Sequence, residues 1–203
     1  SVRAGDHVLC VQKPYAWTRI LVRDWLPRFG VDISFVDARA PAEVEAAIRE
    51  RTRMIVLESP NSLTMELQDL AAIAAIARAR GIRTLCDNSY SSPLLQRPAA
   101  MGIDLVAHSA TKYLNGHSDV VAGVVCGSAA LIAEIFRGPF MTFGAIPGPF
   151  EAWLLLRGLR TLPVRMERVC ASTLKVLAFL ETHPKVARIY YPGHAQDPQR
   201  ELA

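Results

Sequence analysis

Short apolar runs rich in valine and isoleucine recur along the first 126 residues, separated by longer amphipathic segments. Runs of this length predict buried strands, whereas apolar positions three and four apart predict helices. The predicted strands are residues 7–11, 32–36, 54–58, 83–86, 105–108 and 120–126, and the predicted helices among them are 17–28, 42–49 and 67–80. This alternation favours an α/β fold of three layers, a mainly parallel sheet flanked by helices.

The pattern changes after Gly127, where residues 129–136, 150–159 and 164–181 have helical spacing and only residues 186–190 predict another strand. Residues 138–149 are rich in glycine and proline, which predicts a loop. We therefore expect one domain over residues 1–160, and a connecting helix and the start of a second domain over residues 161–203. The chain starts at Ser1 and stops within a helix-like pattern, so we expect a fragment truncated at both ends.

The composition, 51% hydrophobic and 21% charged over 203 residues, is that of a globular domain rather than a disordered chain. A net charge of +4 with scattered basic residues does not imply nucleic-acid binding. Apolar stretches end well before a bilayer-spanning length, so we expect a soluble, cytoplasmic protein without a membrane partner. The four cysteines are far apart, which favours buried thiols over disulfides or zinc ligands.

Candidate chemistry lies just after the predicted strands, because ligands of open α/β sheets bind beyond the carboxyl ends of the strands. Tyr15, residues 58–62 (ESPNS), Asp87 and residues 108–119 (HSATKYLNGHSD) hold these positions. Taken singly, each has an ordinary explanation: a packed aromatic, a strand-to-helix loop, a helix cap and a solvated lysine. A lysine among small hydroxyl residues at a strand end can also be partly desolvated, which makes its amine nucleophilic.

The combination of these side chains is more specific than any one of them. Pyridoxal 5'-phosphate needs an amine for an imine, a carboxylate for its pyridine nitrogen, hydroxyls for its phosphate and an aromatic ring to stack on. Lys112, Asp87, the hydroxyls of Ser109 and Thr111, and Tyr15 supply all four at predicted strand ends. The nearby His117 can transfer protons, although a hydrogen-bonding role within its loop is the more ordinary reading.

Residues 109–119 (SATKYLNGHSD) resemble the lysine motif of the Cys/Met-metabolism family of pyridoxal-phosphate enzymes. That family includes cystathionine β-lyase, γ-lyase and γ-synthase, methionine γ-lyase and the homoserine sulfhydrylases. Supporting similarity lies at residues 4–8, 58–60, 87–89, 156–162 and 194–198. The resemblance implies that residues 1–160 are an aspartate-aminotransferase-like, fold-type I large domain that lacks its N-terminal part, and that the full-length protein is a homotetramer built as a dimer of dimers.

The resemblance also implies a role for each site residue. Lys112 matches the Schiff-base lysine, Asp87 the partner of the pyridine nitrogen, and Ser109 and Thr111 the phosphate ligands. Tyr15 matches the tyrosine that stacks on the ring and takes part in proton transfer, so Lys112 and Tyr15 are the expected catalytic residues. Ser62 stands where many members have the asparagine that binds the ring hydroxyl.

The specific reaction stays open within the family. A serine at position 62 resembles the bacterial cystathionine β-lyases, whereas residues 114–117 and 144–149 resemble γ-lyases and γ-synthases. The resemblance implies a carbon-sulfur lyase of the trans-sulfuration pathway, acting on cystathionine or a related sulfur amino acid by elimination through an external aldimine. The alternatives are γ-replacement, as in cystathionine γ-synthase or O-acyl-homoserine sulfhydrylase, and an inactive fragment of such an enzyme.

Overall fold

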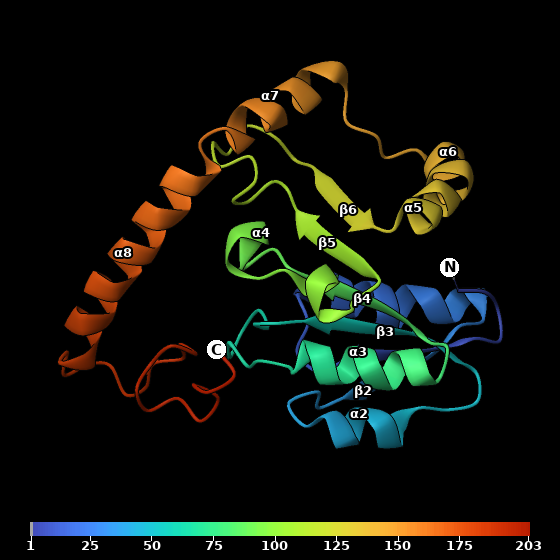
Figure 1. The fold of residues 1–203 in the computed structure, drawn as a ribbon, viewed down its shortest axis with the longest axis horizontal. Coiled ribbons are helices and arrows are strands. Elements are labelled where there is room, and N and C mark those ends of the chain that lie inside the picture. The colour runs from blue at the N-terminus through green and yellow to red at the C-terminus, as the bar shows by residue number, and fades with distance from the viewer. Residues whose placement is uncertain (1) are drawn as a thin grey trace.

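The computed structural model describes residues 2–203 and is built around a six-stranded sheet (Figure 1). The strands are β1 (His7–Val11), β2 (Asp32–Val36), β3 (Thr52–Glu58), β4 (Arg83–Asp87), β5 (Leu105–Ser109) and β6 (Gly123–Gly127). Their order is β2-β1-β3-β4-β5-β6, with β6 antiparallel to β5 and the other neighbours parallel. The predicted mainly parallel sheet is confirmed, and five predicted strands differ by at most two residues at an end.

Helices flank this sheet, as predicted, and most are close to their predicted bounds. They are α1 (Ala16–Ile20), η1 (Leu21–Trp25), η2 (Leu26–Phe29), α2 (Pro41–Ala47), α3 (Leu70–Ala79), α4 (Ser92–Leu95), η3 (Pro98–Met101), α5 (Ala129–Ile135), η4 (Phe136–Phe140), α6 (Met141–Phe143), α7 (Pro149–Leu159) and α8 (Leu162–Glu181). Helix α3 begins three residues later than predicted. Asp69 caps it by accepting a hydrogen bond from the Ala72 N–H at 2.9 Å, while Gln68 bonds instead to the loop after β3.

The core lies where the predicted apolar strands meet. All five residues of β1 are buried, and Leu9 pairs with Ile55 of β3, both of them without exposed surface. Ile73 of α3 is equally buried and belongs to the same apolar cluster. Strands that are covered on both faces read as continuous apolar runs, which explains why the sequence pattern located them. Each such side chain contributes about 1.5–3 kcal/mol to folding.

Three expectations from the sequence are wrong in part or in whole. Residues 186–190 form no strand, because no strand of the described residues 2–203 lies beside them to complete hydrogen bonds. The expected loop at residues 138–149 begins as helix, since η4 accommodates Pro139 and α6 follows it directly. Cys10 and Cys86 are buried thiols, as expected, but Cys126 is exposed and Cys170 half-buried.

The C-terminal part of the chain returns to the sheet domain. Figure 1 shows α7 and α8 beyond the β5 and β6 end, with the 20-residue α8 leading towards the final segment. There the side-chain oxygen of Gln199 accepts the Leu67 backbone N–H at 2.9 Å, and its side-chain nitrogen donates to the Leu67 carbonyl at 2.8 Å. These two hydrogen bonds join the final segment to the residues just before α3. Among residues 2–203, no helix has both the length and the apolar character needed to cross a membrane.

Candidate active site

The candidate site lies at the carboxyl ends of the parallel strands, beginning at the point where the strand order reverses. From β1 the chain continues to β2 on one side, while β3 lies on the other. The loops that leave β1 and β3 therefore diverge there, at the position where open α/β sheets bind ligands. Tyr15 follows β1 and Ser62 follows β3, so both predicted residues belong to these two loops.

Glu58, the last residue of β3, joins these two loops. One of its carboxyl oxygens, Oε2, accepts the Tyr15 backbone N–H at 2.6 Å, and the other, Oε1, accepts the Ser62 hydroxyl. Asn61 has turned away into its own loop, where its side-chain oxygen accepts the Thr64 N–H at 3.0 Å. The half-buried Ser62, rather than Asn61, is therefore the residue whose side chain bonds to Glu58 at the strand end.

Asp87, the last residue of β4, begins a second network. Its Oδ1 accepts the backbone N–H of Ser89 at 2.9 Å and the Ser89 hydroxyl at 2.6 Å. The Ser89 hydroxyl in turn accepts the backbone N–H of Ser109 at 2.6 Å, at the end of β5. Asp87 pairs with Glu58 on one side and Ala107 on the other, so Glu58, Asp87 and Ser109 project from the same face of the sheet.

Lys112 lies in the tight turn that follows β5. Its backbone N–H donates to the Ser109 carbonyl at 3.0 Å, and its own carbonyl accepts the Gly116 N–H at 2.8 Å. The Lys112 side chain is exposed, so the desolvation that the sequence allowed is not present in this structure. The Thr111 hydroxyl accepts the Ala122 N–H at 3.0 Å and donates to the Ala122 carbonyl at 3.3 Å. To donate to a phosphate, the Thr111 hydroxyl would have to give up its 3.3 Å hydrogen bond to the Ala122 carbonyl.

Arg165 of α8 holds the lysine turn from outside the sheet. Its guanidinium donates to the Tyr113 carbonyl at 2.7 Å, to the Gly158 carbonyl at 2.9 Å and to the Thr161 hydroxyl at 3.0 Å. The apolar side chains of Leu114, Leu162 and Met166 pack beneath the same turn. This support holds the backbone around Lys112, whose side chain is exposed.

Two glycines make this close packing possible. Gly116 has a φ of +74°, and a Cβ built there would lie 2.2 Å from the Arg165 guanidinium. Gly158 of α7 touches the lysine turn, since a Cβ there would lie 2.1 Å from the Asn115 carbonyl oxygen. Neither position has space for a side chain, so these glycines set how near the helices α7 and α8 can approach the turn.

Replacing Gly158 with alanine is expected to destabilise the protein by about 3 kcal/mol, because the new methyl group meets backbone rather than a movable side chain. Thermal unfolding measures the loss. The matched control is Gly138→Ala, where the added Cβ has no atom within 4 Å and the change should stay within about 0.5 kcal/mol. Equal unfolding midpoints for the two variants would show that Gly158 of α7 does not pack tightly against the turn.

Burial alters the acid-base properties of this region. The pKa of Glu58 lies above its ordinary value, first because the carboxyl is buried and also because Asp87 is near, while the bonds from Ser62 and Tyr15 oppose the shift. The pKa of His108, on the opposite face of β5, is lowered by burial. His117 is exposed, and its ring Nδ1 lies 2.8 Å from the Asn115 carbonyl oxygen, which supports the loop-structuring interpretation of that residue.

The chemistry of the side chains fits pyridoxal phosphate. A primary amine, a carboxylate held by two hydrogen bonds, a serine hydroxyl and an aromatic side chain come from the ends of β1, β4 and β5 at one edge of the sheet. Among residues 2–203, no three His, Cys, Asp or Glu side chains gather as metal ligands. The amine, the carboxylate, the hydroxyl and the aromatic ring match an organic cofactor with a basic ring nitrogen and an anionic phosphate.

Sequence reasoning assigned no role to Glu58, Ser89 or Arg165, although Glu58 and Ser89 lie in the strand-end segments 58–62 and 87–89. Glu58 carries the same signal as Asp87, a carboxylate that ends an apolar strand. Ser89 is two residues beyond Asp87, within reach of an Asx-type bond. Arg165 gave no signal, because its contact with the turn, at Tyr113, lies 52 residues away in the chain.

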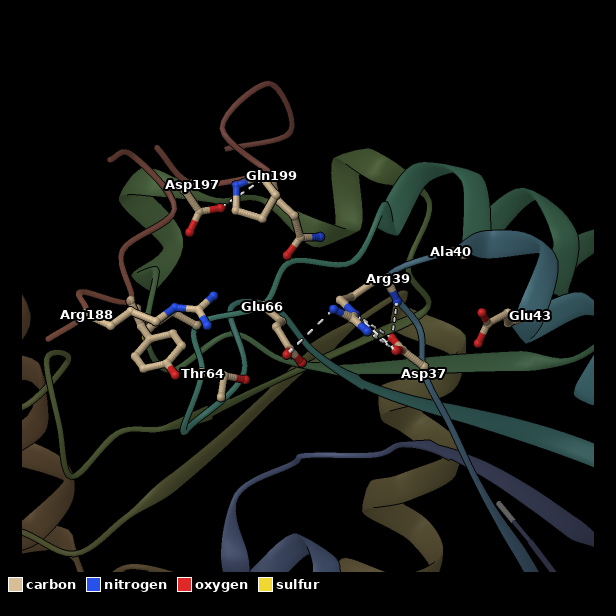
Figure 2. A pocket seen from close by; sticks show the side chains of 12 residues that line it. Asp37, Arg39, Ala40, Glu43, Thr64, Glu66, Arg188, Asp197 and Gln199 are labelled. Carbon is tan, nitrogen blue, oxygen red and sulfur yellow. Dashed lines mark hydrogen bonds and ion pairs between the residues drawn. The ribbon is translucent and has the colours of Figure 1, made fainter. Parts of the chain in front are cut away.

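A separate cavity of about 400 Å³ lies at the β2 side of the same edge, where the C-terminal segment returns (Figure 2). Its walls include Asp37, Glu66 and Arg188, and none of the candidate site residues lines it. Arg39 forms a bidentate pair with Asp37, which lowers the pKa of that carboxyl, and reaches towards Glu66 at 4.0 Å. This cavity is a charge-paired junction that lies apart from the Lys112 turn.

Comparison with known proteins identifies the family of this chain. A family model described as Cys/Met metabolism PLP-dependent enzyme matches residues 1–203. An L-methionine γ-lyase from Treponema denticola is 46% identical, and the match covers all of this chain and 51% of that protein. A probable cystathionine γ-synthase from Herpetosiphon aurantiacus is 42% identical, and the match covers all of this chain and 63% of that protein. The chain thus spans between half and two thirds of these relatives.

A solved structure shows the same fold. The crystal structure of cystathionine γ-lyase from Lactobacillus plantarum, complexed with L-serine, superposes with a TM-score of 0.96 at 38% sequence identity. The superposition covers 99% of the present chain and 53% of that chain. The sheet, its flanking helices and the turns at its carboxyl edge are therefore arranged as in a solved family member.

Proposed function

Because this chain belongs to the Cys/Met metabolism family of PLP-dependent enzymes, we propose that the protein is a carbon-sulfur lyase that acts on cystathionine or a related sulfur amino acid. The placement of Lys112, Asp87, Ser109 and Tyr15 after β5, β4 and β1, at one edge of the sheet, is the observation that carries this proposal. The methionine γ-lyase and cystathionine γ-lyase relatives support elimination as the reaction.

We assign each residue a task. When bound, pyridoxal phosphate accepts the electrons released as a bond to the substrate α-carbon breaks. Lys112 supplies the amine that holds the cofactor and afterwards moves protons, while the Asp87 carboxylate keeps a proton on the ring nitrogen. Ser109 and Thr111 bind the phosphate.

The remaining two residues complete the cofactor contacts. Ser62 contacts the ring hydroxyl, and Tyr15 stacks on the ring and takes part in proton transfer. The half-exposed position of Tyr15 suits a side chain that meets both cofactor and substrate. The hydrogen bond from the Ser62 hydroxyl to Glu58 keeps that hydroxyl at the end of β3.

The first test is covalent trapping of the cofactor. Pyridoxal phosphate is added to the purified protein, the visible absorption of the bound cofactor is recorded, and borohydride reduction is followed by peptide mapping. We expect one modified residue, Lys112. A label on another lysine would overturn the site, and the absence of any label would overturn the proposed function.

Product analysis distinguishes the lyase from γ-replacement, which the probable cystathionine γ-synthase relative supports as the second candidate. The lyase releases a thiol from cystathionine alone. A γ-replacement enzyme instead condenses an activated homoserine ester with a thiol and leaves cystathionine intact. Thiol release from cystathionine would support our assignment, and condensation without release would support the alternative.

We further propose a homotetramer, built as a dimer of dimers, in the cytoplasm. Four large apolar side chains four residues apart, Trp17, Leu21, Trp25 and Phe29, stay exposed along α1, η1 and η2, a stripe that a second subunit would cover. The four free cysteines suit a reducing compartment. Residues 1–160 would form the cofactor domain and residues 161–203 lead into a second one. Sedimentation analysis tests the assembly.

A further inference from the structure

Glu58 is a buried acid that none of the tasks above employs. Only 4% of its surface is exposed, although it carries a carboxyl group at the end of an apolar strand. Acidic side chains are rarely buried unless hydrogen bonds compensate for the lost water. The compensating donors here, from Tyr15 and Ser62, belong to the two residues assigned to the cofactor ring.

The two donors approach different oxygens and come from different loops. The Tyr15 backbone, 43 residues earlier in the chain, donates to Oε2 at 2.6 Å, and the Ser62 hydroxyl donates to Oε1. The Glu58 backbone is itself fixed, because its N–H donates to the Gln68 side-chain oxygen at 3.2 Å. One rigid carboxyl thus sets the separation of the loops that follow β1 and β3.

The register of the sheet places this carboxyl beside the second network. Glu58 pairs with Asp87, whose Oδ1 holds Ser89 and, through it, the end of β5. The two networks therefore meet at neighbouring positions on one face. Movement of the Glu58 carboxyl would shift Tyr15 and Ser62 relative to Asp87, the residue assigned to the ring nitrogen.

We propose that Glu58 is a positioning residue of the cofactor site, which fixes Tyr15 and Ser62 relative to Asp87 through its two carboxyl oxygens. The inference rests on the proposed function, since it needs the cofactor ring to lie between these side chains. Glutamate suits this position because it offers two acceptors. A glutamine of the same size has one acceptor and one donor, so it cannot accept from both loops.

Glu58→Gln tests the proposal through cofactor binding rather than turnover. We expect the dissociation constant for pyridoxal phosphate to rise about 10–100-fold, the effect of losing one charge-assisted hydrogen bond, with a shift in the visible absorption of the bound cofactor. The matched control is Glu167→Gln on the exposed surface of α8, for which both properties should stay unchanged.

A double variant separates positioning from stability. If Glu58 acts through Ser62, then Glu58→Gln should weaken binding much less in a Ser62→Ala background than in the wild type. Full additivity, or a lower unfolding midpoint with unchanged binding and absorption, would overturn the proposal.

Two further outcomes keep the test decisive. Should Glu58→Gln not fold, Ser62→Ala alone carries the test, and wild-type binding and absorption in that variant would also overturn the proposal. Failure of the proposed function would give a different result, because the wild-type protein itself would then take up no cofactor at Lys112.

Discussion

Lys112→Ala is expected to eliminate the covalent retention of pyridoxal phosphate after borohydride reduction. It should also lower the rate of thiol release by at least about 10³-fold, which is within the range that a positioned proton-transfer group supplies. The variant should fold normally, because the Lys112 side chain is exposed and the turn is held through its backbone and by Arg165. Peptide mapping and thiol detection measure the two losses, and thermal unfolding checks the fold.

Two matched variants show whether the effect comes from the amine of Lys112, from its positive charge, or from the loss of any lysine. Lys112→Arg keeps a positive charge but stays protonated at any accessible pH, so it should be as inactive as alanine. Lys175→Ala removes an exposed lysine of α8, and it should keep full labelling and full rate. Equal labelling of Lys112→Ala and the wild type would place the covalent link on a different residue.

The strands of the sheet were predictable because their burial depends on the residues within each strand. Strands buried on both faces need continuous apolar residues, and β1 and β3 have them at the predicted positions. The predicted strand at residues 186–190 had similar apolar character but no neighbouring strand within the described residues. A strand is stable only as part of a sheet, so local composition could not decide that segment.

The candidate residues were predictable for a related reason: parallel strands bring their carboxyl ends to one edge, wherever they lie in the sequence. Asp87 and Ser109 therefore lie near each other, joined by Ser89. The roles of Glu58 and Arg165 depend on which loop packs on which, at separations of 43 and 52 residues. Those contacts require the folded chain, which is why residue type and spacing did not identify them.

Asp87→Asn should lower the rate of thiol release by about 10²–10⁴-fold, because the half-buried Asp87 carboxylate would pair with the protonated ring nitrogen of the bound cofactor. Losing one partner of a desolvated charge pair costs about 3–5 kcal/mol, and each factor of ten in rate corresponds to about 1.4 kcal/mol. Asparagine has the same size and keeps an oxygen at Oδ1. It can still accept both bonds from Ser89, so the link to Ser109 should persist. The substitution therefore removes the charge and preserves the scaffold.

Ser89→Ala is the complementary variant, since it keeps the Asp87 charge and removes the hydroxyl that joins β4 to β5. Losing this hydrogen bond should lower the rate only about tenfold. Both variants should still be labelled at Lys112, and their unfolding midpoints separate lost stability from lost catalysis. A near-normal rate in Asp87→Asn, with Ser89→Ala impaired, would mean that Asp87 organises the strand ends and does not hold a proton on the cofactor ring.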